Sequence, residues 1–106
     1  MAQHFRVGRL SQEIQREVND ILLKRVRDPR VKDVTITGVE VSGDLQHATI
    51  YYSILSDKAS DEKKVQTGLD KATSLIRGEL GHRLSIYVTP EIKFERDKSV
   101  QYGDHI

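Results

Sequence analysis

The sequence has 106 residues, 37% of them hydrophobic and 31% charged, and a formal net charge of +1. This length and composition exclude a disordered or fibrous chain, so we expect residues 1–106 to form a single globular domain. The absence of cysteine excludes disulfides, a thiolate nucleophile and a cysteine-rich zinc site. No apolar run has the length of a membrane span or the pattern of a signal peptide. We therefore expect a cytoplasmic protein without a membrane partner.

The first predicted element is an amphipathic helix over residues 7–26. Its apolar positions, spaced by three and four residues as on one face of a helix, are Val7, Leu10, Ile14, Val18, Ile21, Leu22 and Val26. The helix is expected to end near Arg27, because Asp28 precedes Pro29 and a residue before proline avoids the helical region.

A β-hairpin is predicted next. Residues 34–37 and 39–42 alternate apolar with polar side chains, but the parity of the apolar positions changes across Gly38, which predicts a β-bulge there. Turn-forming residues at 42–45 lead to a second alternating segment at 48–54. Two antiparallel strands joined by a short turn are therefore expected.

The second half of the chain predicts further helices and a third strand. Ser60 suits a helix N-cap, and apolar residues continue from there at helical spacing. Several glycines and the cap-like pair at 73–74 disfavour one continuous helix, so two shorter helices meeting near Ala72 are expected. After Arg83, apolar alternation over 84–94 predicts the third strand. The order helix, strand, strand, helix, helix, strand gives an α+β fold with helices on one face of a three-stranded sheet.

The sequence offers no candidate catalytic or metal site. Its four histidines are scattered singly, and its glycines are too widely spaced for a dinucleotide fingerprint or a P-loop. An acylphosphatase-like hydrolase is an alternative for a domain of this size, but it would need an arginine and an anion-binding loop after a first strand, whereas this chain opens with a helix. We expect no enzyme, no cofactor, no metal and no small-molecule substrate.

Two groups of basic residues are candidates for RNA binding. The first group lies in the last turn of the first helix and the bend after it, and consists of Arg25, Arg27, Arg30 and Lys32. The second group flanks the expected helix junction, where free backbone N–H groups can meet phosphate, and consists of Lys71, Arg77, His82 and Arg83. The competing interpretation is compensation of the helix dipole plus ordinary solubility.

Aromatic residues are few. Tyr51 lies on the polar face of the second strand, where it could stack on a base or serve as a cross-strand partner. A non-specific single-strand RNA binder is a further alternative, but it would need several interleaved aromatics, and aromatic content is 6%.

Several blocks of the sequence resemble the ribosome-binding factor A family, in the family's order along nearly the whole chain. The stretches that carry the resemblance are Arg27-Asp28-Pro29-Arg30-Val31, Val34 through Ser42, Asp44-Leu45, Ala48-Thr49-Ile50-Tyr51-Tyr52-Ser53, Ile76-Arg77, Leu80-Gly81, Pro90-Glu91-Ile92, Phe94 and Asp97-x-Ser99. The resemblance implies a type II KH-like fold. It also implies association with the free small (30S) ribosomal subunit and its rRNA, in late maturation of 16S rRNA and in cold adaptation, without catalysis or a cofactor.

The resemblance also points to a kink between two helices. RNA-binding KH modules clamp the nucleic-acid backbone with a Gly-x-x-Gly loop, which this chain lacks. The family typically has Ala-x-Gly there, and the matching positions are Ala72, Thr73 and Ser74, with serine in place of glycine. The family often carries a further C-terminal tail, so we expect such a tail to be missing here. A monomer is expected, because Pro90 and nearby charges disfavour pairing of the third strand.

Overall fold

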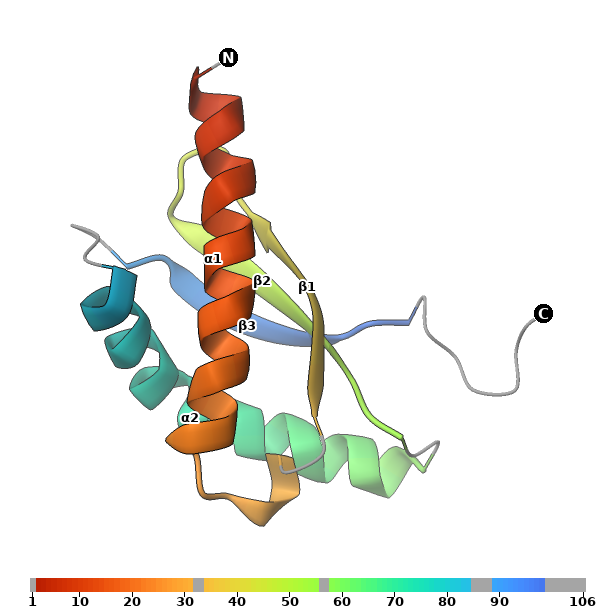
Figure 1. The fold of residues 1–106 in the computed structure, drawn as a ribbon. Coiled ribbons are helices and arrows are strands. Elements are labelled where there is room, and N and C mark those ends of the chain that lie inside the picture. Colours follow the sequence, from red (N-terminus) through yellow and green to blue (C-terminus); the bar gives the residue numbers. More distant parts are fainter. Residues whose placement is uncertain (1, 32–33, 56–57, 85–88, 99–106) are drawn as a thin grey trace.

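The computed structural model describes residues 2–31, 34–55, 58–84 and 89–98. The elements, in chain order, are helix α1 (Ala2–Lys24), 3-10 helix η1 (Pro29–Val31), strands β1 (Thr35–Val41) and β2 (His47–Ser53), helix α2 (Ala59–Leu84) and strand β3 (Glu91–Arg96). The strands form one sheet in the order β1-β2-β3. Helix α1 crosses in front of the sheet and packs on β1 and α2, while α2 packs on β3 (Figure 1). The predicted α+β fold is confirmed.

Helix α1 begins and ends earlier than predicted. Its buried stripe consists of Ile14, Val18, Ile21 and Leu22, as the apolar spacing predicts. The helix ends at Lys24, and the backbone N–H groups of Arg25 and Val26 both donate to the carbonyl oxygen of Ile21, at 2.7 and 3.2 Å. Arg25 and Arg27 therefore lie beyond the helix, and the prediction that they belong to its last turn was wrong. Of the basic residues there, Lys24 is the one within the last turn.

The predicted β-bulge is confirmed in the hairpin. Strands β1 and β2 are antiparallel, and their register shifts between Ile36 and Gly38, which leaves Thr37 as the extra residue. Ile36 before the bulge and Val41 after it are both buried, so the bulge lets both halves of β1 face the core. A Cβ atom on Gly38 would meet no heavy atom within 4 Å, so packing does not require glycine there.

Strand β2 lies at the centre of the sheet and pairs in parallel with β3. A parallel pair needs a crossover connection, which α2 provides. The hydroxyl of the buried Tyr52 donates to Oε1 of Gln66 at 2.6 Å, and Nε2 of Gln66 donates to the carbonyl oxygen of Phe94 at 3.0 Å. One glutamine of α2 thus holds the helix to both of these strands.

The prediction of two helices meeting near Ala72 was wrong, because residues 59–84 form one continuous helix. The axis of α2 nevertheless changes direction between its N-terminal and C-terminal halves (Figure 1). Within α2, the hydroxyls of Thr67 and Thr73 donate to the carbonyl oxygens of Lys63 and Leu69, each at 2.9 Å. Such i to i−4 bonds from threonine bend helices without breaking them.

The third strand begins later than predicted. Leu84 is still helical, residues 85–88 lie outside the described part of the chain, and β3 starts at Glu91. Pro90 stands immediately before the strand, where its missing N–H interrupts no ladder.

Candidate nucleic-acid interface

One member of each predicted basic group, Arg30 and Lys71, lies where η1 packs on α2. A Cβ atom placed on Gly68 of α2 would lie 2.9 Å from Cγ1 of Val31 and 3.3 Å from Cβ of Arg30. Only glycine permits so close an approach of the η1 side chains to the backbone of α2. The chain after α1 is therefore held directly against the middle of α2, next to Lys71.

Arg30 is fixed by its neighbour Asp28. Its Nε lies 2.9 and 3.0 Å from Oδ1 and Oδ2 of Asp28, its Nη2 lies 2.5 Å from Oδ2, and its backbone N–H donates to Oδ1 at 2.9 Å. These hydrogen bonds, together with the nearby charge of Lys71, lower the pKa of the Asp28 carboxyl to about 2. The guanidinium plane is thus held in one orientation while 34% of the side chain stays exposed.

Three further predicted residues are exposed. Arg27 precedes Asp28 and forms no ion pair with any residue that the structure describes, and Lys71 and Ser74 lie on the outer face of α2. The charge of Lys71 is close enough to Asp28 to act on its pKa. We call the set Arg27, Arg30 and Lys71 the η1–α2 surface.

Arg77 forms hydrogen bonds with the backbone just before β3. Its Nε donates to the carbonyl oxygen of Pro90 at 3.0 Å, and its Nη2 donates to that of Thr89 at 2.9 Å. The same Nη2 lies 3.3 Å from a carboxylate oxygen of Glu91. Backbone carbonyls just before an edge strand need such donors, so this arginine has a structural role that the sequence did not reveal.

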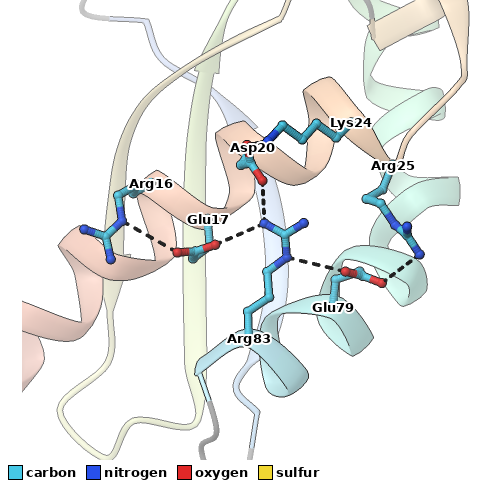
Figure 2. A network of polar contacts seen from close by, with 7 residues as sticks. All are labelled: Arg16, Glu17, Asp20, Lys24, Arg25, Glu79 and Arg83. Atoms are coloured by element: carbon cyan, nitrogen blue, oxygen red, sulfur yellow. Dashed lines mark hydrogen bonds and ion pairs between the residues drawn. The ribbon is translucent and has the colours of Figure 1, made fainter.

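Arg83 ties the end of α2 to α1 (Figure 2). Its Nη1 lies 2.6 Å from Oδ2 of Asp20 and 3.1 Å from Oε1 of Glu17, and its Nε lies 3.4 Å from Oε1 of Glu79. The hydrogen bonds to Asp20 and Glu17 raise the pKa of Arg83 further above its usual range. Arg25 joins the same network through Glu79, at 3.3 Å, although 55% of its side chain stays exposed.

The remaining predicted residues differ in burial and in the contacts they make. Ala72 is half-buried and packs against the core, and Thr73 is occupied by its bond to Leu69. Lys32 lies outside the described residues. The Tyr51 hydroxyl donates to Glu40 at 3.2 Å across the hairpin, which favours the cross-strand interpretation.

Comparison with known proteins decides the family. The family model described as ribosome-binding factor A matches residues 6–106. The ribosome-binding factor A of Lactiplantibacillus plantarum is 78% identical over 106 residues, which is 100% of this chain and 91% of that protein. The chain belongs to the ribosome-binding factor A family.

Solved structures of ribosome-binding factor A have the same fold. The solution structure of a putative ribosome-binding factor A from Thermotoga maritima is 33% identical, with a TM-score of 0.78 over 95% of each chain. A homology model of Thermus thermophilus ribosome-binding factor A, described as fitted into a cryo-EM map of a complex of that protein with the 30S subunit, is 17% identical, with a TM-score of 0.69. It covers 85% of this chain and 93% of its own, and at that identity it shows the fold alone.

Sequence reasoning missed three residues beside the η1–α2 surface. Asp28 positions Arg30, and the triplet Asp28-Pro29-Arg30 contains the signal, since an aspartate readily bonds the backbone two residues on. Leu55 and Lys64 line a pocket next to Arg30. Leu55 is an apolar residue in an otherwise polar connection, and Lys64 belongs to the basic run that includes Lys63.

The described residues show neither a metal site nor a membrane span. Among them, no group of three His, Asp or Glu side chains could hold a metal ion. Neither helix, as far as the structure describes it, combines the length and apolarity needed to cross a bilayer.

Proposed function

We propose that the protein binds the small ribosomal subunit through ribosomal RNA, with the η1–α2 surface as its contact. Membership of the ribosome-binding factor A family supports a role on the ribosome. The Thermus thermophilus relative described in a complex with the 30S subunit supports the small subunit as the partner. The finer proposal is assistance in late maturation of 16S rRNA, including at low temperature, by a cytoplasmic monomer that acts without catalysis.

One observation carries the choice of surface. The packing of η1 on Gly68 brings Arg30 and Lys71 together, although they are far apart in the sequence. Arg27 and Lys71 are exposed and have no ion-pair partner among the described residues. Exposed cations of this kind suit the phosphates of a folded RNA.

Arg77 and Arg83 are less suited to binding RNA than the sequence suggested. Both bind groups of the protein itself, and Arg83 is 24% exposed with three carboxylates around it. A charge reversal at either residue would disturb the fold as well as any binding. Arg27 and Lys71 are therefore the better positions for a test.

The test is to change Arg27 and Lys71 to Glu together and to measure binding to purified small subunits by co-sedimentation across a salt series. We expect weaker binding. We also expect the plot of log binding constant against log salt concentration to have a smaller slope, by about 0.7–0.9 for each phosphate that the variant no longer neutralises. Large subunits and whole ribosomes are measured in parallel, and the wild-type protein should favour the small subunit.

The matched control changes Arg9 and Arg16 of α1 to Glu, which alters net charge by the same amount at exposed positions outside the surface. This control should bind like the wild type. Equally weakened binding in both double variants would assign the effect to overall charge and contradict the proposed surface. Wild-type protein that does not sediment with small subunits would contradict the function itself.

A further inference from the structure

A pocket of about 470 Å3 opens beside Arg30, at the junction of η1, the end of β2 and the start of α2. This size is within the range of small-molecule pockets. Its apolar lining consists of Pro29, Val34, Ile54, Leu55 and Val65. Leu55 is 80% exposed and therefore presents an apolar surface at the pocket.

Polar groups stand at the edge of this apolar space. Arg30, Asp61 and Lys64 also line the pocket. Arg30 bonds Asp28 through Nε and Nη2, so its guanidinium is rigid and its charge is largely balanced. A planar, balanced guanidinium is better suited to stacking on a flat ring than to capturing a phosphate. Lys64 is exposed and offers a mobile positive charge at the rim.

We propose that this pocket receives one unpaired base of the ribosomal RNA, stacked on the Arg30 plane, while Lys64 contacts the adjoining phosphate. This inference rests on the proposed function and names the RNA element that it recognises. The apolar walls suit the faces of a base. The cation of Lys64 and the carboxylate of Asp61 suit the edges of a base, which carry both hydrogen-bond acceptors and donors. An apolar protein side chain would use the walls but not the cation of Lys64, whereas a nucleotide offers both a ring for the walls and a phosphate for Lys64.

The first experiment uses Leu55→Glu, which places a negative charge at the pocket mouth without removing a buried side chain. Small subunits with bound wild-type or variant protein are probed with dimethyl sulfate and a carbodiimide, which modify the pairing edges of unpaired bases. We expect the wild type to protect one base that the variant leaves reactive. Affinity should fall about tenfold, in line with the removal of one stacked base. Leu23→Glu, at an 81% exposed leucine of α1, is the matched control and should keep the protection.

The second experiment identifies the occupant directly. A benzophenone amino acid replaces Leu55, and the complex with small subunits is irradiated. A cross-link to one site of the ribosomal RNA is expected. A cross-link to a ribosomal protein, or identical base protection by Leu55→Glu and the wild type, would overturn the inference. Both outcomes are recorded on subunits that bind the wild-type protein, so they are distinct from a failure of the proposed function.

Discussion

The guanidinium of Arg83 on α2 lies 2.6 Å from the Asp20 carboxylate on α1, although the two residues are far apart in the sequence. Glu17 and Glu79 complete the arrangement around the same guanidinium (Figure 2). Three carboxylates gathered at one place repel one another unless a cation lies among them. Arg83 is therefore a link between the helices, and its contribution should appear in stability.

Arg83→Ala should lower the melting temperature because it leaves these carboxylates without their common partner. Thermal unfolding followed by circular dichroism measures the effect. The control is Arg16→Ala, since Arg16 is 74% exposed and its single ion pair, with Glu17, spans 3.6 Å. The control should melt like the wild type. Equal melting temperatures for Arg83→Ala and the wild type would contradict the structural role.

Asp28→Asn should remove one component of the stability at neutral pH. The Arg30 hydrogen bonds hold the pKa of Asp28 at about 2 in the folded protein, below its ordinary value of 3.8. The stabilisation is therefore fully present above about pH 4 and is lost as the pH falls toward 2. Melting temperatures of both proteins between pH 2 and pH 6 should differ most at the upper end and converge at the lower end. A difference that stays constant over this range would mean that the Asp28 charge contributes nothing.

Gly68→Ala and Gly78→Ala should have opposite effects although both positions lie in α2. A Cβ on Gly68 would lie 2.9 Å from the buried Val31, so η1 must shift, at a cost of about 1–3 kcal/mol that outweighs a gain in helix propensity of about 1 kcal/mol. A Cβ on Gly78 meets nothing within 4 Å, so that variant should be more stable by about 0.5–1 kcal/mol. Urea unfolding gives both values. Stabilisation by both substitutions would show that η1 does not pack closely on α2.

Ser74→Gly introduces the residue that the resemblance to the family implies at this position. Ser74 is exposed within the continuous helix α2, so the variant should lose about 0.5 kcal/mol through helix propensity alone. Binding to small subunits should be unchanged, because α2 is continuous through Ser74 and its backbone there needs no conformation special to glycine. Failure of a folded variant to bind would show that the serine hydroxyl itself touches the partner.

Local patterns determined most of the elements. The spacing of Ile14, Val18 and Ile21 predicted α1, and the change of apolar parity at Gly38 predicted the bulge. These predictions succeed because helix and strand periods are set by the backbone, so each segment carries its own signal. The same local logic failed for α2, because the helix continues through Gly68, where close packing against Val31 makes glycine the fitting residue.

The roles of the basic residues depended on distance in space. As a sequence, Lys71, Arg77 and Arg83 are equivalent cations, and nothing local separates them. The packing of α1 on α2 places Arg83 among carboxylates, while the C-terminal half of α2 places Arg77 next to the carbonyl oxygens before β3. The packing of η1 on α2 leaves Lys71 exposed beside the fixed Arg30. Composition and periodicity determine which side chains are charged and which face inward. Which charges remain available to a partner is a property of contacts between distant segments, and those exist only in the folded chain.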